Sequence, residues 1–149
     1  MLNSIASNNL FMFTKQFRFN LVQLVFNYIF RLENDLSHEL NEVILQSTTS
    51  EEKKSLENII KNFEEYKTKA EPFLSDFGWK KTPFLSRAVL ITFVNERQYF
   101  ESTEQSKAIA EYLHLTQDLA GADSVALVHA VIGKMSKTVE SSDVISQKL

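Results

Sequence analysis

Residues that break regular structure are scarce in this chain, whose 149 residues include only three glycines and two prolines. A β fold of this size needs many tight turns, and glycine and proline are among the residues that most often form them. The scarcity therefore favours a helical fold. The length suits one domain with a core large enough to fold without disulfide bonds. The sequence contains no cysteine, which suits a reducing environment, and we expect a cytoplasmic protein.

The spacing of apolar residues predicts a compact all-α fold of about six or seven helices. The first is expected over about residues 14–32, where apolar residues occupy most sides of the helix. Another is expected from Thr49 until Pro72, with Ile60 among its buried residues. The segment "FLSRAVLITFVNE" could form a buried strand, but its length and its cap favour a helix. The expected N-terminal caps are Asn34 or Asp35, Thr49 in a capping box with Glu52, Thr82 before Pro83 at the first helical position, Ser102 in a capping box with Gln105, and Asp123.

We expect one domain over residues 14–138, between a flexible segment (1–13) and a mobile tail (139–149) that has no sustained apolar pattern. The apolar run of the first helix is not expected to enter a membrane, because it is too short and polar residues interrupt it. The chain also starts with the polar "NSIASNN" ahead of its first cations, which is the wrong order for a secretory signal.

Positive charge is concentrated at the start of the chain. The first 32 residues carry Lys15, Arg18 and Arg31 and no acidic residue, hence +3, so the other residues sum to -6 because the whole chain is -3. Such asymmetry inside an acidic protein indicates a contact with a polyanion, although three charges are few enough to arise by chance. Lys80 and Lys81 are further candidates for phosphate contacts. The neighbouring Trp79 could stack on a base, but we favour a tryptophan that folds onto the core.

No residue pattern indicates catalysis, and we expect a protein that is not an enzyme. Glu111 with His114, and Asp35 with His38, have the spacing of ligands in di-iron helical bundles. The helix that carries Glu111 and His114 is expected to turn both toward solvent, whereas ligands must face the bundle interior. His129 lies on or beside an apolar stripe, where a core or boundary histidine is the commoner case.

Two segments of the second half resemble the closing half of the NusB family of bacterial transcription antitermination factors. They are "FLSDFGWKKTPFLSRAVLITFVNE" and "KAIAEYLHLTQDLAGADSVALVHAVIGKMSK". The first helix, "RFNLVQLVFNYIF", resembles the start of the same family. The positions that match family motifs are Arg87, Ala88, Val89, Leu90, Glu96, Ile109, Glu111, Leu113, Leu115, Gly121, Asp123, Ser124 and Lys134.

The resemblance implies an adaptor of two packed helical bundles, without catalytic residues or a cofactor. NusB proteins pair with NusE, a small-subunit ribosomal protein, and together they bind the boxA segment of single-stranded RNA within the RNA polymerase antitermination complex. This promotes read-through in ribosomal RNA operons. The chain departs from the family in its N-terminal cations, where several arginines are reduced to Lys15 and Arg18.

The resemblance and the charge pattern together predict the site residues. Lys15, Arg18, Lys80 and Lys81 are expected to bind RNA. Phe26, Phe30, Arg87 and Asp123 are expected to bind the protein partner. Three alternatives stay open: a NusB-fold interaction module, such as a homodimer, that has lost RNA binding; the NusB domain that accompanies ribosomal RNA methyltransferases; and a metal-dependent oxidase.

Overall fold

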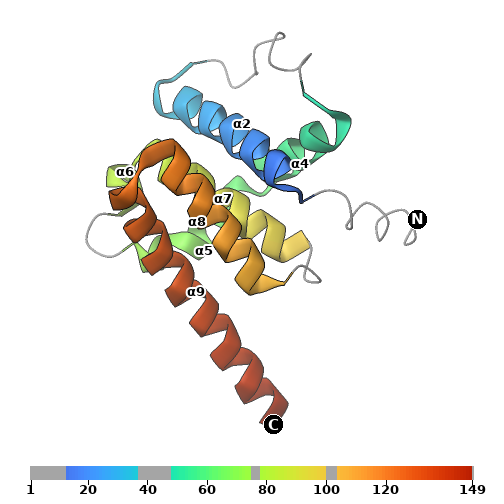
Figure 1. Cartoon of the computed structure of the whole chain (residues 1–149), viewed down its shortest axis with the longest axis vertical. Coiled ribbons are helices and arrows are strands. Elements are labelled where there is room, and N and C mark those ends of the chain that lie inside the picture. Colours follow the sequence, from blue (N-terminus) through green and yellow to red (C-terminus); the bar gives the residue numbers. More distant parts are fainter. Residues whose placement is uncertain (1–12, 37–47, 75–77, 100–103, 149) are drawn as a thin grey trace.

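The structure is a computed structural model that describes residues 13–36, 48–74, 78–99 and 104–148. In this part of the chain it contains seven α-helices, one 3-10 helix and no strand, so the predicted all-α fold is confirmed (Figure 1). The elements are α2 (Lys15–Glu33), α4 (Ser50–Lys61), α5 (Phe63–Ala70), η1 (Glu71–Phe73), α6 (Gly78–Lys81), α7 (Phe84–Tyr99), α8 (Gln105–Ala120) and α9 (Ala122–Lys148).

Helix α7 is the centre of the fold. Every residue from Ser86 to Glu96 is buried, and the helix packs against α2, α5, α8 and α9 (Figure 1). A helix that is surrounded on all sides needs an apolar sequence all round. The run of apolar residues that could also have formed a strand is therefore the central helix of the bundle.

Helix α2 begins and ends within one residue of its predicted bounds. Thr14 is its N-cap, and the Thr14 hydroxyl oxygen accepts a hydrogen bond of 3.0 Å from the backbone N–H of Phe17. One face is buried against the core through residues such as Leu21 and Val25. The opposite face exposes Phe26 and Phe30, so α2 is less enclosed than its apolar sequence predicts.

The helix predicted from Thr49 to Pro72 is divided in two at Asn62. Its start is confirmed, because Thr49 and Glu52 form both hydrogen bonds of the capping box. At Asn62 the side-chain amide donates to the backbone oxygen of Asn58, and such local side-chain bonds compete with helix geometry. Ile60, which was expected in the core, is 36% exposed.

Two predicted caps, Asp123 and Thr82, differ in the structure. Asp123 lies in the first turn of α9 rather than at its cap, because the first helical bond runs from the N–H of Val125 to the oxygen of Gly121. Gly121 has φ +90°, a conformation that suits glycine. The Thr82 hydroxyl donates to the oxygen of Gly78, and the bond from the N–H of Arg87 to the oxygen of Pro83 begins α7 one residue later than predicted.

Other predictions concern segments at the edge of the described residues. Asn34 caps the C-terminus of α2, and the helix expected after it falls in residues 37–47, outside the described part. Ser102 also lies outside it, and Glu104 is the N-cap of α8. Residues 1–12 of the predicted flexible segment are outside it as well. The backbone of α9 is helical as far as Lys148, while the mobility of residues 139–149 stays a prediction.

No helix in the described ranges combines the length and the apolar character needed to cross a membrane.

Candidate functional site

Arg18, expected to contact RNA, is buried in an ion pair with Glu96 of α7. Its Nε donates to Glu96 Oε1 at 2.9 Å and its Nη2 donates to Oε2 at 2.8 Å. Arg18 is 3% exposed and Glu96 is 0% exposed. The hydroxyl of Tyr112, from α8, donates to the same Oε1 at 2.8 Å. Two parallel charge-assisted bonds are the strongest arrangement that an arginine and a carboxylate can form.

The pair keeps Arg18 charged in the core. Burial alone lowers the pKa of Arg18, but the hydrogen bond and the negative charge of Glu96 raise it by more, so the pKa lies above its ordinary value. The guanidinium carbon also lies 5.7 Å from the ring centroids of both Phe13 and Tyr112. The expectation that Arg18 presents its charge to RNA at the surface is therefore wrong.

A sequence signal for this burial exists. Arg18 precedes Leu21, Val22 and Val25 by three, four and seven residues, which puts it on the buried face of the same helix. Glu96 follows Phe93 at helical spacing on a helix that is buried all round. A buried charge needs a partner of opposite sign.

Arg87, expected to bind a protein partner, is also buried and holds three elements together. Its Nη1 donates to Glu33 Oε1 at 2.9 Å, at the end of α2. Its Nε donates to the oxygen of Thr82 at 2.7 Å and its Nη2 donates to the oxygen of Lys80 at 2.5 Å. Arg87 is 2% exposed, so the prediction of a surface contact is wrong. All three of these nitrogen atoms donate to acceptors within this chain.

The predicted tryptophan packing is confirmed. Trp79 is buried in the core, with its ring centroid 6.1 Å from that of Phe63. The Arg87 guanidinium carbon lies 5.4 Å from the Trp79 ring centroid, and Lys67 Nζ lies 5.7 Å from it. The ring is therefore not free to stack on a base.

The remaining predicted cations are exposed but are not brought together. Lys15 is the first residue of α2, whereas Lys80 and Lys81 belong to α6, which Arg87 ties to Glu33 at the other end of α2. At a rise of about 1.5 Å per residue, the backbones of Lys15 and Glu33 are about 27 Å apart. No single phosphate could reach both groups of lysines. Asp123 is exposed at the start of α9.

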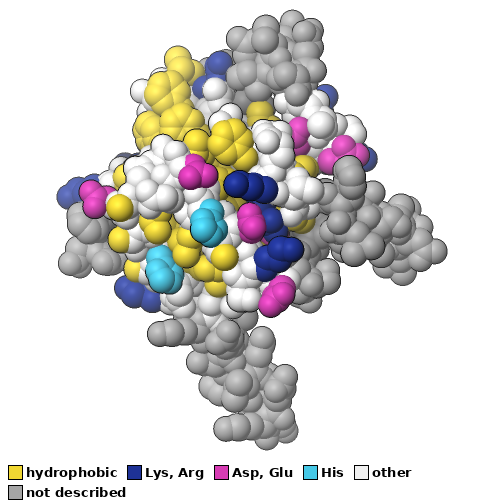
Figure 2. Space-filling model, viewed as in Figure 1, with side chains coloured by type: hydrophobic (Ala, Val, Ile, Leu, Met, Phe, Trp, Pro, Cys, Tyr) yellow, Lys and Arg dark blue, Asp and Glu magenta, His cyan; other side chains and the backbone are white. Residues whose placement is uncertain are grey.

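Exposed aromatic side chains lie between these cations. Phe26 is 37% exposed and Phe30 is 42% exposed, and both rings pack edge-to-face on Phe84 of α7, at centroid distances of 6.4 Å and 6.0 Å. We call Phe26, Phe30 and Phe84 the aromatic patch. Figure 2 shows hydrophobic side chains gathered at the upper left of the molecule, where α2 lies in Figure 1. Phe26 and Phe30 are therefore accessible, as their predicted contact with a protein partner requires.

The histidines form no candidate metal centre in the part of the chain that the structure describes, where no three histidine, aspartate or glutamate side chains are close enough to share an ion. His114 is exposed and Glu111 is half-buried. His129, expected at the edge of the core, is exposed. His38 lies outside the described residues.

Comparisons with protein-family models, with curated proteins and with solved structures found no match. The resemblance to the NusB family therefore depends on the motifs of the sequence.

We expect Glu96→Gln to destabilise the fold by about 3–5 kcal/mol, because it leaves the buried charge of Arg18 without a counter-ion. Urea unfolding followed by circular dichroism measures the free energy of unfolding. The control is Glu65→Gln, which breaks the exposed pair of Glu65 with Lys69 and should cost less than about 1 kcal/mol. A double variant, Arg18→Met with Glu96→Leu, should lose less than Glu96→Gln. Equal losses for Glu96→Gln and the control would contradict this account.

The buried hydroxyl of Tyr112 is expected to make the free energy of unfolding fall in alkali. Burial, together with the adjacent negative charge of Glu96, holds the pKa of Tyr112 well above its ordinary value. Above about pH 10 the unfolded chain loses this proton while the folded chain keeps it, so the free energy of unfolding falls by about 1.4 kcal/mol per pH unit from this group. Unfolding free energies measured on both sides of that pH should show a shallower alkaline decline in Tyr112→Phe. An identical decline in both proteins would contradict the assignment.

Proposed function

We propose that this chain is a cytoplasmic, non-catalytic adaptor of the NusB type in transcription antitermination. It binds NusE through the aromatic patch and contributes a small number of cations to boxA RNA held by the complex. The observation that carries the proposal is the aromatic patch formed by α2 and the start of α7. The helical fold and the NusB-like motifs agree with it.

The aromatic patch has the properties of a protein-binding surface. Exposed clusters of large apolar side chains mark interaction sites, and phenylalanine is enriched at the cores of interfaces. Phe84 holds Phe26 and Phe30 in place edge-to-face, while the Arg87 guanidinium carbon lies 4.9 Å from the Phe84 ring centroid. Because Arg87 is itself anchored by Glu33, the patch is preorganised. A rigid surface loses little side-chain entropy on binding.

The RNA contribution rests on Lys15, Lys80 and Lys81. Lys15 is at the N-terminus of α2, where free N–H groups and the helix dipole favour phosphate. The three lysines lie toward the two ends of α2, so a strand that met all of them would run along this helix. For single-stranded RNA, each phosphate contact contributes only about 0.7 to the slope of log affinity against log salt concentration. Three contacts therefore give a shallow salt dependence. Useful affinity then requires NusE beside the chain.

The burial of Arg18 favours a second candidate, a NusB-fold interaction module that has lost RNA binding. Without Arg18, Lys15 is the one exposed cation within the first turn of α2 as far as that turn is described. In this candidate the aromatic patch binds only protein, either NusE or a second copy of the chain.

Phe26→Glu together with Phe30→Glu should weaken NusE binding by at least about tenfold, because charged groups would be buried at the centre of the interface. Calorimetry with purified NusE measures the affinity, and circular dichroism checks that the helices persist. Gln23→Glu is the matched control, since Gln23 is another exposed residue of α2. If both proteins bound NusE equally well, the patch would not be the docking surface.

Lys15→Gln, Lys80→Gln and Lys81→Gln combined should lower the affinity of the NusE complex for boxA RNA and reduce its salt slope by about 2. NusE association should not change. The control removes the same charge elsewhere, with Lys53→Gln, Lys54→Gln and Lys61→Gln on α4, all exposed. Filter binding over a salt series measures both quantities. If RNA affinity and slope matched those of the control, the second candidate would replace the first.

A further inference from the structure

Helix α6 carries two of the lysines proposed to meet RNA, but it is too short to be stable by itself. It comprises the four residues Gly78–Lys81, whereas an isolated helix needs about 12–15 residues to be even marginally stable in water. Trp79 anchors it by packing in the core against Phe63, while Lys80 and Lys81 are exposed. The position of both lysines therefore depends on contacts that other residues make with α6.

Arg87 of α7 makes hydrogen bonds with the backbone around these lysines. Its Nη2 donates to the oxygen of Lys80, and its Nε donates to the oxygen of Thr82. The last carbonyl groups of a helix have no partner within it, so Arg87 supplies one from outside. Its guanidinium carbon also lies 5.4 Å from the ring centroid of Trp79. Arg87 thus holds both the end of α6 and the side chain that anchors it.

The same guanidinium group contacts the aromatic patch. Its carbon lies 4.9 Å from the ring centroid of Phe84, on which Phe30 packs edge-to-face. Its Nη1 donates to Glu33 Oε1 at 2.9 Å, and Glu33 follows Phe30 by one turn of α2, at the border of the patch. One buried side chain therefore connects the proposed docking surface with the short helix that carries the lysines.

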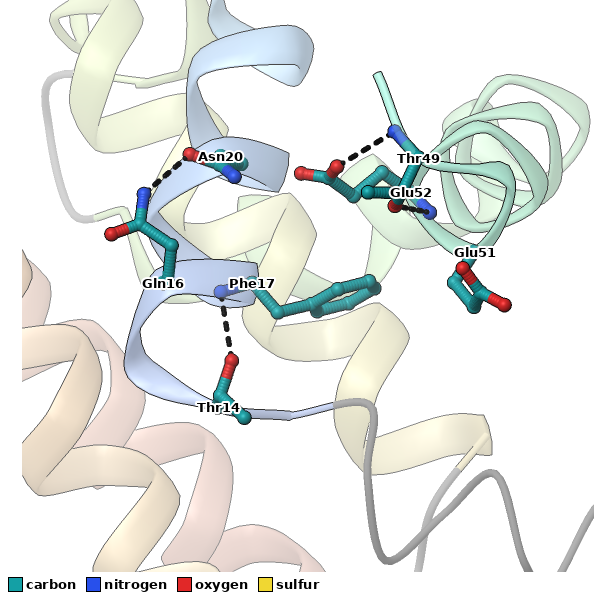
Figure 3. Close-up of a pocket in the computed structure, with 7 residues that line it drawn as sticks. All are labelled: Thr14, Gln16, Phe17, Asn20, Thr49, Glu51 and Glu52. Atoms are coloured by element: carbon teal, nitrogen blue, oxygen red, sulfur yellow. Dashed lines mark hydrogen bonds between the residues drawn. The ribbon is translucent and has the colours of Figure 1, made fainter. Parts of the chain in front are cut away.

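Lys15, the third exposed lysine, stands apart from the patch. Its backbone is about 16 Å from that of Phe26 along α2. At that end of the helix, Phe17 faces Thr49 and Glu52 of α4 across a small cavity (Figure 3). A ligand on the aromatic patch therefore has a direct connection to the lysines of α6 and none of this kind to Lys15.

We propose that Arg87 is a positioning residue that couples the aromatic patch to Lys80 and Lys81. When α6 leaves the core, Arg87 loses its bonds to α6 and is released from Phe84. A protein partner that binds the patch in its preorganised form opposes this opening, because it binds the closed form better. RNA binding by the two lysines is strengthened as the closed fraction rises. The inference rests on the proposed function, which names the partner and the RNA.

Hydrogen exchange of the Thr82 amide, measured by nuclear magnetic resonance on the whole chain without a partner, tests the connection itself. This N–H donates to the oxygen of Trp79 and so reports the opening of α6. Glu33→Gln should speed its exchange about fivefold, the factor expected for losing one hydrogen bond of ordinary strength. The control, Glu57→Gln, removes an exposed glutamate of α4 and should leave the rate unchanged.

Arg87→Met decides whether the effect passes through the guanidinium group. Methionine fills much of the volume without a hydrogen-bond donor, so Glu33→Gln should no longer change the exchange of Thr82 in this background. The amide of Leu90, in the buried middle of α7, reports global unfolding. Equal acceleration of the Thr82 and Leu90 amides by Glu33→Gln would overturn the coupling. So would an equal effect of Glu33→Gln with Arg87 and with methionine at this position.

NusE tests the consequence for the complex. Saturating NusE should slow exchange of the Thr82 amide at least about fivefold in the wild type and leave it unchanged in Arg87→Met. NusE that bound without slowing this exchange would overturn the coupling and leave the proposed function standing. A chain that failed to bind NusE would instead overturn the proposed function, and the exchange experiment without a partner would still decide whether Arg87 connects Glu33 to α6.

Discussion

The buried ion pair between Arg18 and Glu96 determines how α2 lies on the rest of the molecule. A buried charge without a partner is costly, so α2 cannot slide along α7 without breaking two charge-assisted hydrogen bonds. A second pair, Arg87 with Glu33, acts at the other end of the same two helices. In the first pair α2 supplies the arginine, and in the second α7 supplies it. The two antiparallel helices are thus clamped at both ends by reciprocal pairs.

The surface features of α2 follow from this clamp. With both ends held, the face that carries Leu21 and Val25 is fixed against the core, and the face that carries Phe26 and Phe30 must point outward. The first turn of α2 is held beside the first turn of α4, which creates a small cavity between them. The exposed aromatic rings are consequently an outcome of charges in the core, and they keep their place without a partner.

The helices could be predicted from the sequence because periodicity and capping are local properties. The hydroxyl oxygens of Thr14 and Thr49 each accept a capping hydrogen bond from the backbone N–H three residues later. Donor and acceptor therefore lie in the same short stretch of sequence. The break at Asn62 was missed because an asparagine inside a long helical pattern carries only a weak signal. The charge pattern and the NusB resemblance assign Arg18 and Arg87 to RNA and protein contacts, which charged residues usually make at the surface. Their partners, Glu96 and Glu33, are far away in the sequence, and the cavity depends on two helices that no local pattern relates.

The burial of Arg18 also changes how the proposed RNA contact would have to work. An arginine held by two oxygens in the core cannot exchange them for a phosphate without unfolding the start of α2, so of the predicted RNA-binding residues only the exposed Lys15, Lys80 and Lys81 remain. Lysines toward opposite ends of a helix cannot bind the same phosphate, and each adds little binding free energy in physiological salt. Their contribution becomes significant only when another protein holds the RNA nearby, because the second contact is then intramolecular and has a high effective concentration. In the proposed adaptor function, the protein surface of this chain would therefore have to come first in assembly, with RNA contact following from it.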